Sequence, residues 1–267
     1  MSQARHQTVA TEAAEMYEAL VVPVLFQPWA SQVANAAAVQ RGDHALDVAC
    51  GTGVLAREMA ARVQPTGSVV GLDRDESMLA VAARLSPEIG WRHGAAEALP
   101  FADDSFDAVG SQFGLMFFTD RRAALREMMR TLRPGGRLAV AVWDALERTP
   151  GEAAFTRLLE DRFGASVADI LRVPFALGNP GEVKALFAES GIPSATLTTH
   201  QGTAHYPSLR DWVSTEVKGW PPLAQRLDEA QFEALLAAAQ EQLRSFVARD
   251  GTVAFSMPAH IVTATKG

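Results

Sequence analysis

The sequence predicts an α/β protein in which helices cover both faces of a mostly parallel sheet and a mainly helical cap is added. Between His44 and Trp143, short runs rich in β-branched residues alternate with stretches of helical pattern, which is typical of consecutive βαβ units. After Trp143 the segments become mostly helical, which indicates the cap. With 267 residues the chain can bury one large domain with an insertion or two small domains, and we expect one domain plus a cap.

Strands and helices alternate through the first half of the chain. The expected strands are 44–49, 68–73, 89–93, 105–111 and 136–143, and the expected helices are 52–62, 76–84 and 120–132. Asp120 is suited to cap the last of these helices, and Arg133-Pro134-Gly135-Gly136 ends it and turns the chain into the next strand. The arginines of this helix have the spacing of a solvated face, at Arg121, Arg122, Arg126 and Arg130.

The second half of the chain contains fewer strand signals. We expect a helix at 180–190, a strand at 194–203, helices between 208 and 249, and a final strand at 252–264. Pro258 lies inside this last segment and has no N–H to give to a neighbouring strand. The pairing of the final strand should therefore be bulged or interrupted at Pro258.

Composition excludes several classes of function. The net charge of −7 leaves no basic stripe for the phosphates of DNA or RNA, so a nucleic-acid partner is not expected. The single cysteine, Cys50, allows neither an intrachain disulfide nor a cysteine-based metal site, and we predict no metal. No apolar run approaches the roughly 20 residues that span a bilayer, and the N-terminus lacks a signal-peptide pattern. We therefore expect a cytoplasmic protein that acts on a small molecule, as a monomer or a homodimer.

A glycine-containing segment at 46–53, Leu-Asp-Val-Ala-Cys-Gly-Thr-Gly, marks a ligand site where a buried strand ends and a helix begins. Gly51 and Gly53 let the backbone approach a ligand closely, and the N-terminus of the following helix favours an anionic group. Residues 51–56 also satisfy the G-x-G-x-x-(G/A) dinucleotide pattern, with Asp73 about 20 residues downstream. The segment alone leaves a nicotinamide-dependent dehydrogenase open.

Two carboxylates refine this prediction. Asp47 lies inside the strand end, where a charge is costly unless it meets hydrogen-bond donors or a cation. S-adenosylmethionine (SAM) supplies an ammonium and a sulfonium, whereas a dinucleotide pyrophosphate would be repelled. Asp73 closes the second strand and is suited to bind both hydroxyls of a ribose, although it is also explained as the N-cap of the helix at 76.

Three further segments carry a family resemblance. They are Gly-Ala-Ala-Glu-Ala-Leu-Pro-Phe at 94–101, Asp-Asp-Ser-Phe-Asp at 103–107 and Leu-Arg-Pro-Gly-Gly at 132–136. Together with 46–53 and in this order, they resemble the class I SAM-dependent methyltransferases, and more narrowly the type 11 family that includes ubiquinone and menaquinone biosynthesis methyltransferases. The resemblance covers residues 40–145 and implies a Rossmann-like, seven-stranded sheet with SAM as the cofactor.

The resemblance also implies roles for single residues. The aminoacyl end of SAM would lie against Asp47, Ala49, Cys50, Gly51 and Gly53, and Asp73 would hold the ribose. The adenine would lie near Arg74, Met78, Ala95, Ala96 and Glu97, with Ser111 and Phe113 completing the cofactor site. Ala95 stands where relatives often carry an Asp or Asn that binds the adenine amino group, so only backbone groups are left for that contact. Met78 is equally explained as a core residue and Glu97 as a solvated or capping carboxylate.

We expect the chain to divide into three regions. Residues 1–40 would form a helical lid, residues 41–145 the SAM-binding core, and residues 146–267 the rest of the core, at about 180–203 and 251–265, with cap insertions. Helices that precede the first strand often cover SAM in this family, which places Tyr17 near the sulfonium or the acceptor. The alternative is that this helix merely packs on the sheet.

The methyl acceptor should lie beyond the carboxyl ends of the strands, which leaves few candidate side chains. His205 and Tyr206 follow a strand whose end should face the cofactor, and we predict them as an acid–base pair, although a lone histidine is more often an ordinary loop residue. The apolar stretch 113–118 is either a substrate wall or a segment buried beneath the next helix. Candidate substrate contacts are Tyr17, Gln112, Phe113, Trp143 and Trp212.

The sequence thus favours a SAM-dependent methyltransferase whose acceptor is small and apolar or aromatic, with O-, N- and C-methylation all open. A SAM-binding regulatory protein without turnover is the non-enzymatic alternative, because no acid or base accompanies Phe113. The dehydrogenase is the weaker enzymatic alternative, because Asp47 opposes it.

Overall fold

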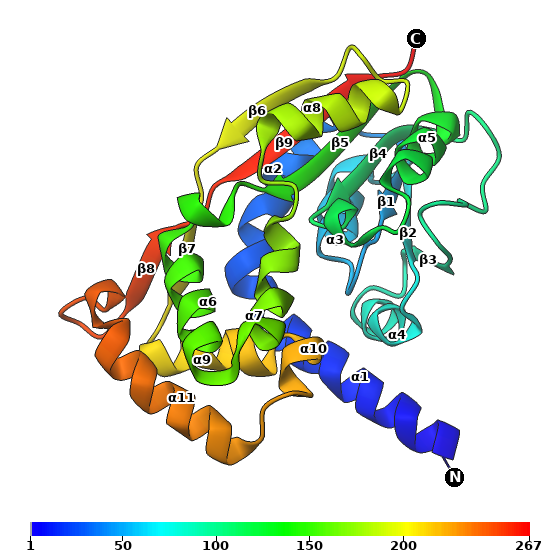
Figure 1. The fold of residues 1–267 in the computed structure, drawn as a ribbon. Coiled ribbons are helices and arrows are strands. Elements are labelled where there is room, and N and C mark those ends of the chain that lie inside the picture. Colours follow the sequence, from blue (N-terminus) through cyan, green and yellow to red (C-terminus); the bar gives the residue numbers. More distant parts are fainter. Residues whose placement is uncertain (1) are drawn as a thin grey trace.

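The computed structural model describes the backbone of residues 2–267 and the side chains of residues 10–267. Its centre is a seven-stranded sheet with the order β3-β2-β1-β4-β5-β9-β6 (Figure 1). The strands of this sheet are β1 (His44–Val48), β2 (Ser68–Asp73), β3 (Gly90–His93), β4 (Phe106–Gln112), β5 (Leu132–Trp143), β6 (Thr196–His200) and β9 (Ala259–Thr265). Only β9 runs antiparallel to its neighbours, β5 and β6. The predicted α/β fold with a mostly parallel seven-stranded sheet is confirmed.

Helices cover both faces of the sheet. They are α2 (Gln27–Ala36), α3 (Val54–Val63), α4 (Glu76–Leu85), α5 (Arg121–Thr131) and α8 (Pro180–Glu189). Every residue from Leu138 to Trp143 in β5 is buried, although side chains alternate between the faces of a strand. Trp143 packs on Trp29 of α2, so Val142 must point to the opposite face. The parallel core is therefore sealed on both sides, and only the strand ends are open to a ligand.

The cap is built on a second, two-stranded sheet. β7 (Thr203–Tyr206) pairs with β8 (Val253–Ser256) in antiparallel fashion. α6 (Pro150–Phe163) and α9 (Leu209–Lys218) contact this sheet. On these two helices pack α7 (Ala165–Arg172), α10 (Pro221–Ala224) and α11 (Glu229–Gln242), as Figure 1 shows. The core of the cap is aromatic, with Trp212 packed against Phe155, Tyr206 and Phe255.

Two predicted strands are each divided into two strands at the boundary between core and cap. The segment expected at 194–203 divides into β6 and β7, and the segment expected at 252–264 divides into β8 and β9. The second break lies at Met257–Pro258, as predicted from Pro258, while Gly202 lies at the first, where a Cβ would stand 2.3 Å from the Trp29 ring. The chain therefore crosses between the two sheets at a proline on one side and a glycine on the other.

The N-terminal segment connects core and cap. α1 (Ser2–Leu20) contacts α4 on the core side and α9 and α10 on the cap side, and a π-helical turn at Val22–Phe26 joins it to α2 (Figure 1). The lid predicted at 1–40 includes Met1, which lies outside the described residues. Residues 2–267 contain no helix that is both long enough and apolar enough to cross a membrane.

Candidate cofactor and acceptor site

A cavity of about 570 Å³ lies beyond the carboxyl ends of β1, β2 and β4, in the size range of small-molecule sites. Its floor is formed by the sheet ends, and its other walls come from α1, the 3₁₀ turns Leu115–Phe117 and Val173–Phe175, and α10. The cavity therefore lies where the three predicted regions of the chain meet. Of the cofactor residues expected from the sequence, it is lined by Asp47, Ala49, Cys50, Gly51, Asp73, Arg74, Met78, Ala96, Glu97 and Phe113.

The turn after β1 has an unusual backbone. Ala49, Gly51 and Gly53 all have positive φ angles, of 58°, 54° and 89°. A Cβ on Gly53 would also lie 2.4 Å from Cη2 of Trp91, so this position accepts only glycine. Ala49 holds a left-handed conformation without being glycine, which is typical of strained functional turns. The turn brings the backbone of Gly51 to the cavity surface, opposite Tyr17.

Asp47 presents an unsatisfied oxygen at this turn. The carboxyl is 1% exposed, and its Oδ2 accepts the Ala56 N–H at 2.9 Å while Oδ1 has no partner among the described residues. Burial is the main reason that the pKa of Asp47 is raised to about 8; the Ala56 N–H opposes this rise and the nearby Asp73 adds to it. A buried carboxylate without a cation is costly, so this oxygen is suited to a ligand ammonium. The residues present thus fit the aminoacyl end of SAM.

Asp73 connects β2 to the glycine turn. Its Oδ2 accepts the Gly51 N–H at 2.7 Å and its Oδ1 accepts the Asp75 N–H at 2.9 Å. Burial raises the pKa of this carboxyl as well. The N-cap of α4 is Asp75, whose side chain accepts from Ser77 N, and not Asp73. The capping role left open for Asp73 is therefore wrong, and its carboxylate lies at the cavity wall, where a ribose could bind.

The loop 94–105 supplies part of the cavity wall, where the family resemblance places the adenine. Gly94, Ala96 and Glu97 line the cavity, whereas Ala95 does not. Glu97 accepts the backbone N–H groups of Thr119 at 2.9 Å and Asp120 at 3.4 Å, so it ties the loop to the start of α5. Glu97 is thus a capping carboxylate at the cavity edge, which is one of the two roles expected for it.

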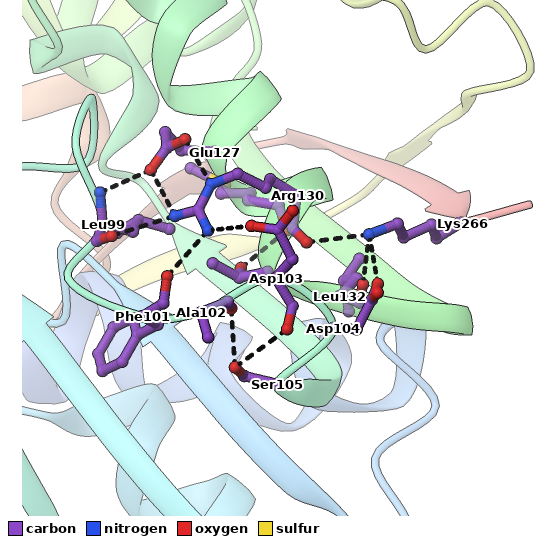
Figure 2. A network of polar contacts seen from close by, with 12 residues as sticks. Leu99, Phe101, Ala102, Asp103, Asp104, Ser105, Glu127, Arg130, Leu132 and Lys266 are labelled. Atoms are coloured by element: carbon purple, nitrogen blue, oxygen red, sulfur yellow. Dashed lines mark hydrogen bonds and ion pairs between the residues drawn. The ribbon is translucent and has the colours of Figure 1, made fainter.

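Arg130 holds this loop from behind, as Figure 2 shows. Its guanidinium donates to the carbonyls of Leu99 at 3.1 Å and Phe101 at 2.8 Å and pairs with Asp103 and Glu127. Glu127 in turn accepts the Leu99 N–H at 2.8 Å. The solvated helix face predicted for Arg130 is therefore wrong, because its partners come from a loop about 30 residues away in sequence.

The other half of the cavity is apolar and largely aromatic. It is formed by Phe26, Phe113, Phe117, Phe118, Ile170, Val173, Pro174, Trp220, Pro221 and Pro222. Phe113, at the end of β4, has a φ of 56° and stacks on Trp143 with the ring centroids 3.7 Å apart. Gln112 donates from Nε2 to the Phe26 carbonyl at 3.0 Å, while its buried Oε1 has no partner among the described residues.

Tyr17 closes the cavity from α1. Its ring packs edge-on against Trp220, with the centroids 6.1 Å apart, and its hydroxyl lies close to Gly51. Burial, together with the charges of Asp73 and Glu18, holds the pKa of the Tyr17 phenol well above its usual range. The phenol therefore stays protonated, so it can form hydrogen bonds but cannot act as a general base.

Several predicted site residues lie away from the cavity. Trp143 and Ser111 stand behind its wall, Gly53 behind its glycine turn, and Trp212 in the core of the cap. His205 is exposed on β7, and Tyr206 is buried in the cap with its hydroxyl 3.2 Å from Glu216. The expected acid–base pair does not face the cofactor region, because β7 leaves the main sheet and pairs with β8 instead.

Sequence reasoning missed all but Trp220 of the residues that the cap brings to the cavity. Ile170, Val173, Pro174 and Trp220–Pro222 belong to no motif, and only tertiary packing places them opposite the glycine turn. The single available signal was the Trp-Pro-Pro triplet, since consecutive prolines stiffen a segment that carries a large ring. No cluster of three or more His, Cys, Asp or Glu residues within the described part of the chain is arranged to hold a metal.

Two sequence relatives resemble a little under half of the chain. A 2-phytyl-1,4-naphtoquinone methyltransferase of Thermosynechococcus vestitus is 42% identical over 119 residues, which are 43% of this chain and 53% of the relative. The ubiquinone/menaquinone biosynthesis C-methyltransferase UbiE of Hahella chejuensis is 43% identical over 118 residues, which are 42% of this chain and 47% of the relative. The chain thus spans about half the length of the curated relatives that it matches.

A solved structure supports the fold over most of the chain. A presumed methyltransferase of Bacillus halodurans is similar with a TM-score of 0.60 at 20% identity, over 89% of this chain and 98% of that protein. At this identity the similarity shows the fold alone. The model of the ubiE/COQ5 methyltransferase family matches residues 3–166, which include α1, the glycine turn, Asp73 and the loop 94–105. The chain therefore belongs to the ubiE/COQ5 methyltransferase family.

Proposed function

We propose that this protein transfers a methyl group from SAM to a small, apolar, aromatic acceptor. The observation that carries the proposal is the division of one cavity into two unlike halves. One half has the glycine turn and two buried carboxylates, and the other has an aromatic wall without any charged side chain. The first half suits the amino acid and ribose of SAM, and the second suits an uncharged ring. Bound SAM would supply a methyl group on a positively charged sulfur.

The aromatic half restricts the acceptor. Among residues 10–267 its lining contains no Lys, Arg or His, so a phosphate or carboxylate on the acceptor would find no partner from these residues. Phe117 and Val173 at the cavity are 47% and 43% exposed, and an apolar substituent could lie across them. The names of the relatives point to quinone rings, and we propose a quinol-like ring as the acceptor class to screen first.

No general base stands in the aromatic half among the side chains that the structure describes. Tyr17 stays protonated, and the carboxylates Asp47 and Asp73 belong to the cofactor half. The acceptor must therefore bring a nucleophile that ionises readily, such as an acidic phenol or an enolisable ring carbon. The contribution of this chain would be alignment and exclusion of water, with the Tyr17 hydroxyl and the Gln112 amide oxygen as the polar groups beside the ring.

Two alternatives from the sequence have different support. The dehydrogenase is not carried forward, because the free Oδ1 of Asp47 would repel a pyrophosphate. A SAM-binding regulatory protein without turnover keeps one specific observation in its favour, which is the absence of a base in the aromatic half. Methyl transfer to an acceptor separates these two functions.

Titration calorimetry with SAM, S-adenosylhomocysteine (SAH) and NADH is the first test. We expect SAM and SAH to bind, and Asp73→Ala to weaken both, while the matched surface variant Asp161→Asn binds like the wild type. Product formation with a panel of hydroquinones and naphthols is then measured by mass spectrometry. Binding of NADH alone would overturn the proposal, and SAM binding without transfer to any acceptor would favour the regulatory function.

The remaining expectations about cellular context stay proposals. We propose that the protein acts in the cytoplasm on a free small molecule rather than on nucleic acid, and as a monomer or a homodimer. We likewise propose that residues 1–40 act as a lid, residues 41–145 as the cofactor-binding core and residues 146–267 as the completing and capping region. Light scattering after gel filtration and limited proteolysis with and without SAH test these statements.

A further inference from the structure

A pair of carboxyl groups is buried inside the cap, away from the cavity. Glu152 of α6 is 2% exposed and Glu216 of α9 is 1% exposed, and neither lines the cavity. Neither forms an ion pair with Lys or Arg within residues 10–267, and Oε1 of Glu152 has no hydrogen-bond partner there. Buried carboxyls without a cation are costly, so a core of apolar side chains would serve stability better. The pair calls for an explanation other than packing.

Three polar groups surround Glu216. The Tyr206 hydroxyl of β7 donates to Oε1 of Glu216 at 3.2 Å, and the carboxyl of Glu152 and the indole of Trp220 also contact Glu216. Burial raises the pKa of Glu152 well above its usual range and the pKa of Glu216 to about 7. Glu152 therefore remains a protonated donor, while Glu216 carries the charge near neutral pH. The three donors take the place of a cation around this carboxylate.

Trp220 links this buried pair to the cavity. The indole ring lines the cavity beside Pro221 and Pro222, and it meets Tyr17 edge-on at a centroid distance of 6.1 Å and Phe26 at 6.3 Å. The backbone of this segment is held by the short helix α10, in which Leu223 N and Ala224 N bond to the Trp220 carbonyl. The ring itself is held by aromatic contacts, and the Glu216 carboxyl lies beside it. Its orientation sets the shape of the aromatic half.

We propose that Glu216 is a positioning residue, which from inside the cap holds the Trp220 indole in the wall of the acceptor half of the cavity. This inference rests on the proposed function only for the identity of the molecule that the wall binds. An ionised carboxylate accepts a hydrogen bond more strongly than a neutral one. The groups that face Glu216 are Glu152 from α6, Tyr206 from β7 and Trp220, and the first two stay protonated as the pH rises. The Trp220 anchor should therefore tighten between pH 6 and pH 8.

Fluorine NMR of the 5-fluorotryptophan-labelled protein tests the anchor without any ligand. The chain has five tryptophans, and Trp220→Phe assigns the resonance of Trp220. We expect this resonance to shift with a midpoint near pH 7 in the wild type and in the surface control Glu241→Gln, and to show no such shift in Glu216→Gln. An unchanged resonance in the wild type, or the same titration in Glu216→Gln, would overturn the proposal.

Binding of 1,4-naphthoquinone in saturating SAH tests the consequence for the acceptor half. Glu216→Leu should weaken probe binding about tenfold in the wild-type background, because a buried charged hydrogen bond is lost. In the Trp220→Phe background, Glu216→Leu should weaken probe binding by no more than about a further twofold, because Glu216 acts through the Trp220 ring. Equal losses in both backgrounds, or no loss, would contradict the inference.

SAH affinity, measured on the same samples, separates this inference from the proposed function. We expect it to be the same in all variants to within about twofold, because Glu216 does not touch the cofactor half. Failure of the wild type to bind SAH would sink the proposed function and leave the NMR result standing on its own. If Glu216→Leu does not fold, the pH profile of probe binding decides: it should rise from pH 6 to pH 8 in the wild type and stay flat in Glu216→Gln.

Discussion

Replacing Asp47 by Asn should stabilise the ligand-free protein and abolish its binding of SAH. The carboxyl is buried with one free oxygen, and its pKa is raised from 3.8 to about 8, mainly by burial. Between these two values the folded chain holds a proton that the unfolded chain has released. The stability of the wild type must therefore fall as the pH rises from about 4 to about 8 and level off above, by about 1.4 kcal/mol per pH unit.

The magnitude of the effect follows from this window. A pH of 7 is about three units above the pKa of this carboxyl in the unfolded chain, whereas the carboxyl in the folded chain is still mostly protonated. Asp47 therefore lowers the free energy of unfolding at pH 7 by at most about 4 kcal/mol. The uncharged side-chain amide of the Asp47→Asn variant avoids this cost, since it can still accept the Ala56 N–H. The two proteins should have equal stability near pH 4 and diverge above it, with Asp47→Asn the more stable.

Urea unfolding from pH 4 to pH 9, with and without SAH, is the assay. In the wild type SAH should add most stability at high pH, because its ammonium pairs with the ionised carboxylate, and Asp47→Asn should gain none. Asp161→Asn, which removes an exposed carboxylate, should follow the wild type throughout. Parallel pH curves for the wild type and Asp47→Asn would refute the reasoning about burial, and full SAH binding by Asp47→Asn would refute the assigned role of Oδ1.

Three further predictions concern the walls of the cavity. Gly53→Ala should abolish SAH binding and cost about 1–3 kcal/mol of stability, because it adds a clash with Trp91 to a positive φ; calorimetry and thermal unfolding check this, with Gly181→Ala as the tolerated control. Arg130→Gln should free the loop 94–105, lower the melting temperature and weaken SAH binding, whereas Arg126→Gln on the exposed side of α5 should change neither. His205→Ala should leave the rate of methyl transfer unchanged once an acceptor is found, and a loss of roughly 100-fold would restore the histidine as a base.

Much of the cofactor half could be predicted from local sequence. Asp47, Gly51 and Asp73 lie next to strand ends that a run of apolar residues makes recognisable, and parallel strands bring their carboxyl ends to one edge of the sheet. The break at Pro258 was also predictable, because a proline has no N–H and interrupts strand pairing at its own position. In each case the residue is placed by its own position in a strand or at a strand end, which a sequence shows directly.

The part of the acceptor half that comes from the cap was decided by tertiary structure alone. Trp220 and Val173 reach the cavity because α7, α9 and α10 fold back over the sheet, and their spacing in the sequence carries no trace of that approach. His205 and Tyr206 were misplaced because the strand expected at 194–203 changes sheets at Gly202, where close packing against Trp29 leaves no room for a side chain. Arg130 and Glu216 depend on partners from distant segments. Contacts between distant segments are set by the packing of whole elements, so only the folded chain shows them.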